Sequence, residues 1–218
     1  FYRIKENLKM ISKIKNPSPY TTLCNVISNK NYHKIKEMID FSIDVKTNAL
    51  YFTVVDAIMD KTDSLLLSQR ERELVLKDEC EIRERLNASP SDSKINLDNF
   101  DGFIRRLSNK DISKGEYDKK TIDKIPCYVG WIFTRIMAKG DVSPCCRGVN
   151  LPLGNIYKQS FSNIWHSNKY NEFRSKAKYL PKTDTYFSKI GCYKTCDNLM
   201  HNEEIHKRLC RQRSLNTF

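Results

Sequence analysis

Cysteine is the residue type whose number and spacing point most directly to chemistry in this chain. The chain has 218 residues and eight cysteines, and the candidate metal ligands lie in its C-terminal half: Cys127, Cys145, Cys146, Cys192 and Cys196. Four thiolates match the ligand number of a structural zinc ion or a four-iron four-sulfur (4Fe-4S) cluster. A disulfide framework would need an oxidising compartment, which nothing in the sequence indicates. The cysteines therefore predict a metal centre.

A β-hairpin is predicted over residues 128–146, with one arm at 131–137 and the other at 142–146. The two ends of a hairpin meet in space, so Cys127 and Cys145 can face one site although they are distant in the sequence. The hairpin therefore predicts how the first two ligands come together.

The other two ligands, Cys192 and Cys196, enclose three residues in a short loop. Gly191, directly before them, allows the backbone to turn tightly. On a strand, the neighbours Cys145 and Cys146 would point to opposite faces, so a single site uses only one of them. We take Cys145 as the ligand and Cys146 as its alternative.

Two other functions remain open at this level. Cys192, Cys196, His201 and His206 have a spacing that suits zinc, which would make the region a basic zinc module contacting nucleic acid. This reading leaves Cys127 and Cys145 unexplained. The third reading is an interaction domain without a cluster.

The elements that must position these residues begin with alternating helices and strands over residues 1–86. Buried strands are predicted at 21–27 and 49–55, and Ser68 and Glu71 form a capping box that opens a helix to about residue 86. This order predicts βα units and a parallel sheet. Two strands alone do not make a stable covered sheet, so the segment is expected to end a larger α/β sheet or barrel.

The remaining cysteines are expected to be structural. Cys24 falls in the first predicted strand and Cys80 in the helix that follows Ser68, which are positions typical of core cysteines. Cys210 has no partner in the pattern and is expected to be a bystander.

The net charge of +12, from 38 Lys and Arg against 26 Asp and Glu, permits attraction to nucleic acid or anionic membranes. Many lysines alternate with Ile, Asn and Ser, a pattern typical of a solvated surface, so nucleic acid is not favoured as a partner. No apolar run is long enough to span a bilayer, and residues 1–15 have no signal-peptide core. We expect a cytoplasmic protein, and the start at Phe1 rather than Met indicates a piece of a longer one.

The order of short motifs from residue 125 onward is more specific than any one of them. In sequence, these are Ile125-Pro126-Cys127, Gly140-Asp141-Val142-Ser143-Pro144-Cys145, Leu153-Gly154-Asn155-Ile156, Ile164-Trp165, Phe173-Arg174, Gly191-Cys192 and Cys196. This series resembles the SPASM domain of radical S-adenosylmethionine (radical SAM) enzymes over about residues 125–200.

The resemblance implies an α/β chain, in which the last βα units of a partial (β/α) barrel precede a small α+β cluster domain with a β-hairpin. The corresponding ranges are 1–107 for the barrel, 108–124 for a connector and 125–210 for the SPASM-like domain. It implies that Cys127, Cys145, Cys192 and Cys196 hold an auxiliary 4Fe-4S cluster. Lys139, Arg147 and Lys194 would stabilise the reduced cluster if they face it.

For the barrel segment, the resemblance implies cofactor-binding roles for two residues. Asn31 follows the first strand, where family members often carry Asn, and Asp56 follows the second strand, at the end where barrel active sites gather.

The CxxxCxxC motif that binds the catalytic cluster in this family is absent from the sequence. This chain alone therefore cannot cleave S-adenosylmethionine. By resemblance, the parent protein is an enzyme that uses S-adenosylmethionine and a catalytic 4Fe-4S cluster. Its expected partners are a missing N-terminal barrel half and a peptide, protein or small-molecule substrate.

Overall fold

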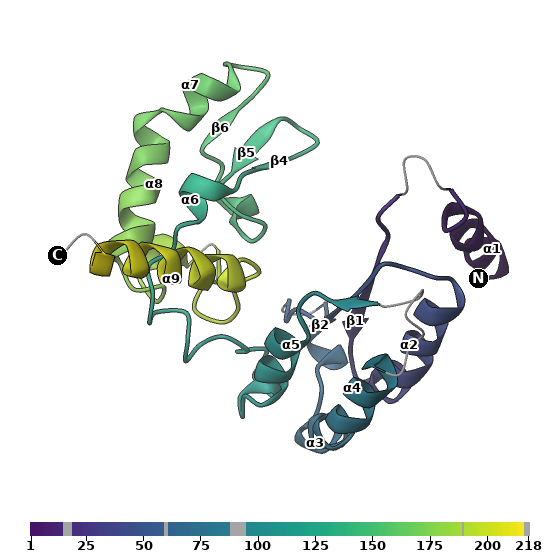
Figure 1. Cartoon of the computed structure of the whole chain (residues 1–218). Coiled ribbons are helices and arrows are strands. Elements are labelled where there is room, and N and C mark those ends of the chain that lie inside the picture. Colours follow the sequence, from purple (N-terminus) through teal and green to yellow (C-terminus); the bar gives the residue numbers. More distant parts are fainter. Residues whose placement is uncertain (15–18, 59–60, 88–94, 189, 216–218) are drawn as a thin grey trace. The chain divides into compact units, whose positions relative to one another are not determined.

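The computed structural model describes residues 1–14, 19–58, 61–87, 95–188 and 190–215 of an α/β chain (Figure 1). The chain divides into two compact units, Phe1–Gly115 and Glu116–Phe218. The division falls inside the segment that we expected to be a connector. Among the described residues, no helix combines the length and the apolar character needed to cross a bilayer.

Unit 1 confirms the predicted alternation of helices and strands. Its elements are α1 (Tyr2–Ile11), β1 (Thr22–Ile27), η1 (Tyr32–Lys34), α2 (Ile35–Asp44), β2 (Ala49–Val54), η2 (Asp63–Leu65), α3 (Gln69–Lys77), α4 (Glu79–Asn87), β3 (Asn96–Leu97), α5 (Phe100–Leu107) and η4 (Ile112–Lys114). The strands form a parallel sheet in the order β1-β2-β3.

In the described part of unit 1, helices cover one face of this sheet and leave the other open. On that face, Phe52 of β2 packs against Phe100 and Phe103 of α5, with ring centroids 6.2 and 5.7 Å away. On the other face, alternate residues of β1 are exposed, including Val26 at 51%. Cys24 lies on this open face, so its predicted burial is wrong, because β1 is covered on one face only.

The side chain of Asn99 continues the hydrogen bonding of β2 beyond the short strand β3. Its Oδ1 accepts from the Phe52 backbone N–H at 3.1 Å, and its Nδ2 donates to the Phe52 carbonyl. Asn99 is buried, so the carboxamide replaces the backbone partner that β3 would have supplied.

Replacing Asn99 with alanine is expected to weaken the sheet by about 2 kcal/mol, because both buried polar groups of Phe52 lose their partner. Hydrogen exchange of the Phe52 amide should then be about 30-fold faster. Asn96→Ala is the matched control, because the exposed side-chain carboxamide of Asn96 donates to Asp98, two residues along the chain. Equal protection of Phe52 in both variants would contradict this role.

The single helix predicted from Ser68 to residue 86 is two helices in the structure, so its predicted continuity is wrong. The capping box is confirmed, with Ser68 Oγ accepting from the Glu71 N–H and Glu71 accepting from the Ser68 N–H. The helix is interrupted at Asp78, which separates α3 from α4. Asp has a low helix propensity, and its carboxylate pairs with Lys36 of α2 at 3.2 Å.

Unit 2 consists of short elements. These are α6 (Val129–Ile132), β4 (Arg135–Ile136), β5 (Asp141–Ser143), η5 (Gly148–Asn150), β6 (Gly154–Asn155), α7 (Phe161–Trp165), α8 (Asn168–Tyr179), η6 (Thr185–Phe187) and α9 (Leu199–Leu215). The strands form an antiparallel sheet in the order β4-β5-β6.

The hairpin of unit 2 is shorter than predicted. Residues 129–132 form α6 instead of the first half of a strand, because Gly130 lies against α8, where a Cβ would come within 3.0 Å of Arg174 Cγ. β5 ends at Ser143, so Cys145 and Cys146 follow the strand and do not belong to it. The argument that they point to opposite faces of a strand is therefore wrong.

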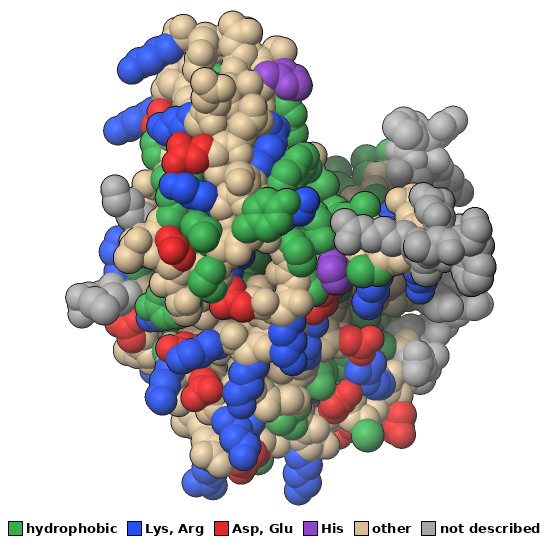
Figure 2. All heavy atoms as spheres, turned by 90° about the vertical axis from the view of Figure 1, so that its left-hand side faces the viewer, with side chains coloured by type: hydrophobic (Ala, Val, Ile, Leu, Met, Phe, Trp, Pro, Cys, Tyr) green, Lys and Arg blue, Asp and Glu red, His purple; other side chains and the backbone are tan. Residues whose placement is uncertain are grey.

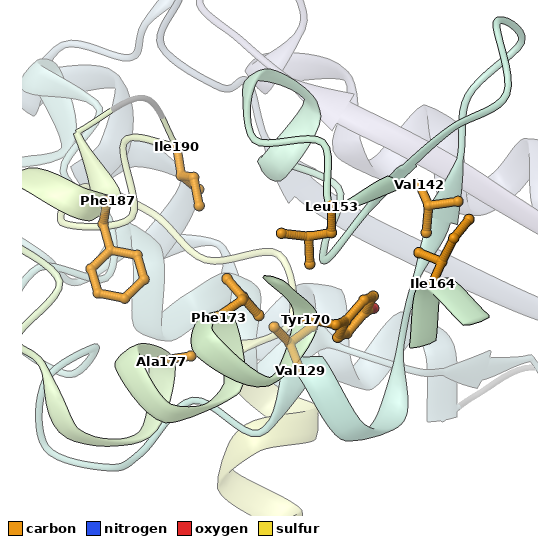
Figure 3. Close-up of a cluster of buried hydrophobic side chains, with 9 residues drawn as sticks. All are labelled: Val129, Val142, Leu153, Ile164, Tyr170, Phe173, Ala177, Phe187 and Ile190. Atoms are coloured by element: carbon orange, nitrogen blue, oxygen red, sulfur yellow. The ribbon is translucent and has the colours of Figure 1, made fainter. Parts of the chain in front are cut away.

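The core of unit 2 is formed by side chains from α6, β5, α7, α8 and η6 and from the segments between them. Figure 3 shows Tyr170 and Phe173 of α8 beside Val129 of α6, with Phe187 and Ile190 at one end and Val142 and Ile164 at the other. Three of the candidate cysteines, Cys127, Cys145 and Cys192, pack against this cluster. The core therefore positions the candidate site directly.

The charged side chains are mixed on the surface. Figure 2 shows Lys and Arg side chains spread over one face of the molecule, with Asp and Glu side chains between them. The ion pairs on the surface include Lys36 with Glu81 at 2.6 Å and Arg85 with Asp40 at 2.7 Å.

Candidate metal centre

One cavity of unit 2 is lined by four cysteines: Cys127, Cys145, Cys192 and Cys196. They come from three segments, namely the residues before α6, the turn after β5 and the loop before α9. The cavity contains about 410 Å³ of space between atoms, including its part open to solvent. The structure thus brings together the four predicted ligands, whose role as ligands stays a prediction.

The walls of the cavity are largely apolar. Val129, Phe173, Phe187 and Ile190 line it together with the cysteines. Such walls withdraw the thiols from water and disfavour their charged form. A positively charged metal or cluster iron is the partner that reverses this preference, because thiolates are the metal-binding form of cysteine.

The thiols affect one another electrostatically. Burial and the nearby Cys127 raise the pKa of Cys145 to about 12. Burial is also the main cause of the raised pKa of Cys127, Cys192 and Cys196. The nearby Cys127 and Cys145 raise the pKa of Cys192 and Cys196 further. The four sulfurs therefore share one electrostatic environment.

Backbone N–H groups approach three of the four sulfurs in the same local pattern. In each case one donor is two residues further along the chain: Val129 for Cys127, Arg147 for Cys145 and Asn198 for Cys196, and Gly148 is a second donor to Cys145. Hydrogen bonds to sulfur favour the thiolate. A side chain adds a further donor, because Asn202 Nδ2 lies 3.9 Å from Cys127 Sγ while its Oδ1 accepts from the Tyr128 N–H at 2.8 Å.

The loop that carries Cys192 and Cys196 is held from both sides. Gly191 has a φ of +67°, so the predicted tight turn before Cys192 is confirmed. Asp118 is buried and receives the Cys196 backbone N–H at 2.9 Å, while its own N–H donates to the Lys194 carbonyl at 3.0 Å. Asp118 therefore fixes the backbone at the fourth cysteine.

Two cations line the cavity, Arg147 and Lys182. Arg147 was expected near the site. Lys182 was missed, because it lies in the sequence among polar residues far from any cysteine. The other two expected cations, Lys139 and Lys194, are not among the residues that line this cavity.

The alternative ligands are placed differently. Cys146 does not line the cavity, and Cys80 and Cys210 are exposed, so the expectation that Cys80 is a core cysteine is wrong. His201 is exposed, and His206 Nδ1 lies 2.9 Å from the Tyr128 hydroxyl. Among the described residues, no three His, Cys, Asp or Glu side chains are gathered tightly enough for a single metal ion.

The two candidate cofactor residues of unit 1 follow neighbouring parallel strands. The Asn31 side chain accepts from the Ser28 N–H at 2.8 Å and donates to the Val26 carbonyl at 2.9 Å, so it shapes the loop after β1. Asp56 follows the end of β2 by two residues and is half-buried. Both lie at the carboxyl edge of the sheet, because β1 and β2 are parallel.

The remaining motif residues build the scaffold. Arg174 is 8% exposed and donates to the carbonyls of Gly130 and Trp165 at 2.9 and 2.8 Å. Its guanidinium lies over the Trp165 ring, 4.7 Å from the centroid. Gly154 touches Ile164, whose Cγ2 would lie 2.7 Å from an added Cβ. These contacts join α6, α7, α8 and β6 around the core.

Comparison with known proteins assigns the C-terminal part of the chain. Residues 127–197 match the SPASM family model, which describes an iron–sulfur cluster-binding domain. No curated protein matches the chain.

Three solved structures are similar, all at low identity. Streptococcus suis SuiB bound to S-adenosylmethionine has 18% identity and a TM-score of 0.47, with 88% of this chain and 43% of SuiB covered. A second structure of Streptococcus suis SuiB has 18% identity and a TM-score of 0.46, with 88% of this chain and 44% of SuiB covered. BtrN in an open conformation has 14% identity and a TM-score of 0.30, with 89% of this chain and 78% of BtrN covered. This chain therefore spans less than half the length of SuiB, and its C-terminal unit carries a SPASM domain, an iron–sulfur cluster-binding domain.

Proposed function

We propose that Cys127, Cys145, Cys192 and Cys196 together bind one auxiliary 4Fe-4S cluster. The observation that carries this proposal is that four thiols from three segments line a single cavity. Four cysteine ligands suit a cluster in which every iron is held by the protein. When bound, such a cluster accepts and releases single electrons.

The residues around the cysteines fit such a group. Backbone N–H groups and Asn202 face the sulfurs, which stabilises the thiolate form and sets the potential of an iron–sulfur centre. The apolar walls exclude water, and Arg147 and Lys182 supply positive charge beside a group that is negative when ligated by four thiolates. The donor set and its surroundings therefore agree.

We further propose that the chain is the C-terminal portion of a cytoplasmic radical SAM enzyme, whose catalytic cluster is bound outside this chain and whose S-adenosylmethionine site includes residues of unit 1. The parallel sheet of unit 1, covered by helices on one face, supports the expectation of a partial barrel. Asn31 would shape the cofactor loop, and Asp56 would contact the cofactor or the substrate from the same edge. The substrate class that we propose is a peptide or protein.

The test of the cluster is a metal analysis of the chain purified or reconstituted without oxygen. We expect about four iron and four sulfide per chain, and broad visible absorbance that bleaches on reduction. A colourless protein with about one zinc per chain would favour a zinc module instead. A folded protein that binds neither iron nor zinc would favour the remaining alternative, an interaction domain without a cluster.

A further inference from the structure

Lys182 is a buried lysine whose ammonium group is held in place beside the cysteine cavity. The residue is 5% exposed, and Nζ donates to the carbonyls of Ala177 and Leu180 at 3.1 and 2.9 Å. It also lies 5.2 Å from the centroid of the Phe187 ring. Its backbone N–H is fixed by Asp123 Oδ1 at 2.7 Å. The side chain is therefore oriented from both ends.

Among the described residues, the ammonium group donates its hydrogen bonds to neutral carbonyls, while the carboxylate of Asp197 lines the same cavity. Within the described part of the chain, no carboxylate forms an ion pair with Lys182, because Asp123 receives the backbone N–H and not Nζ. Withdrawing an unpaired charge from water costs several kcal/mol unless an opposite charge compensates. The groups that face this side chain in the cavity include Cys127, Cys192 and Cys196. Burial raises the pKa of Cys127 and Cys192, and the positive charge of Lys182 acts in the opposite direction on both thiols.

We propose that Lys182 is the counter-charge of the cluster and raises its reduction potential. This inference rests on the proposed function, because it requires a cluster on the four cysteines. Reduction adds one negative charge to the cluster. A fixed positive charge inside a poorly hydrated site stabilises the reduced form more than the oxidised form. Lys182 is a positioning residue in this sense, since it touches no reacting atom.

Nζ also caps the C-terminal carbonyls of α8, so a structural role of Lys182 must be separated from its electrostatic effect on the cluster. Three substitutions at Lys182 separate the two roles. Lys182→Met removes both the charge and the donor, Lys182→Gln keeps a donor without charge, and Lys182→Arg keeps the charge. Lys178→Met is the matched control, because Lys178 is an exposed lysine in the last turn of the same helix.

The experiment is a redox titration of the cluster-loaded chain, followed by visible absorbance and by electron paramagnetic resonance. At the midpoint potential of the unsubstituted protein, we expect the ratio of reduced to oxidised cluster to fall about tenfold in Lys182→Met and Lys182→Gln. This change corresponds to about 59 mV for a one-electron couple. Lys182→Arg and Lys178→Met should stay within about twofold of the unsubstituted protein.

The outcomes separate the two proposals. Unchanged potentials in Lys182→Met and Lys182→Gln would overturn the role of Lys182 while the cluster itself stands. If these two variants lose the cluster while Lys182→Arg retains it, the positive charge is needed for binding, which supports the role. Loss of the cluster from all three would show a structural role and overturn the inference. If the unsubstituted chain binds no iron, the proposed function fails first.

Discussion

Alanine in place of Cys127, Cys145, Cys192 or Cys196 is expected to lower bound iron from about four to less than about one per chain. Each thiolate is a ligand in the proposed site, and the largely apolar walls leave few side chains that could replace it; Asp197 is the one carboxylate among the residues that line the cavity. Iron and sulfide analysis after anaerobic reconstitution, with visible absorbance, measures the effect. The effect should be similar at all four positions.

Cys146→Ala and Cys210→Ala are the matched controls, because neither residue lines the cavity. Both should retain the full iron content of the unsubstituted chain. If Cys146→Ala loses its iron while Cys145→Ala keeps it, the assignment between these neighbours must be exchanged. Full iron content in all four single variants would refute the proposed centre.

Replacing Arg174 with methionine is expected to destabilise unit 2 by about 3 kcal/mol. Methionine keeps the apolar part of the side chain but leaves the Gly130 and Trp165 carbonyls without their charged donor. Burial lowers the pKa of Arg174, because it disfavours the charged guanidinium. The two carbonyls and the Trp165 and Tyr170 rings, over which the guanidinium lies, offset this cost. Both tryptophans of the chain, Trp131 and Trp165, lie in unit 2, so their fluorescence during urea unfolding reports its stability.

Arg208→Met is the control for this measurement. Arg208 forms an exposed ion pair with Glu204 at 2.8 Å, one helical turn away in α9, and its loss should cost about 0.5 kcal/mol or less. The two variants should be compared in the same metal-loading state, with unchanged dependence on urea. Equal midpoints for both would show that Arg174 does not join the helices.

The sequence predicted the elements that depend on local patterns. β1 and β2 lie where apolar runs indicated buried strands, and the capping box at Ser68 is present. The first half of the first hairpin arm was wrong, because apolar residues at 129–133 suit a strand and a buried helical turn equally well, whereas the second half is present as β4. The choice is made by distant residues, since Asn202 binds the Tyr128 N–H and Arg174 binds the Gly130 carbonyl.

The candidate site could be predicted only in part for the same reason. The order of the cysteines and the glycine before Cys192 indicated which thiols meet. Lys182, Asp118 and Asn202 carry no such signal, because a buried lysine, aspartate or asparagine cannot be told from a surface one by its neighbours in the sequence. Their roles arise from long-range packing, for example between Asp118 and the Cys196 N–H.

The strand β1 has consequences for how the protein behaves at high concentration. In the part of the chain that the structure describes, β1 pairs with β2 alone, and none of its six residues is charged. Natural edge strands usually carry lysine, proline or a bulge that discourages a second molecule from adding its own strand. We therefore expect the chain to associate through the free edge of β1 as its concentration rises. This association should limit solubility under conditions in which the chain is still folded.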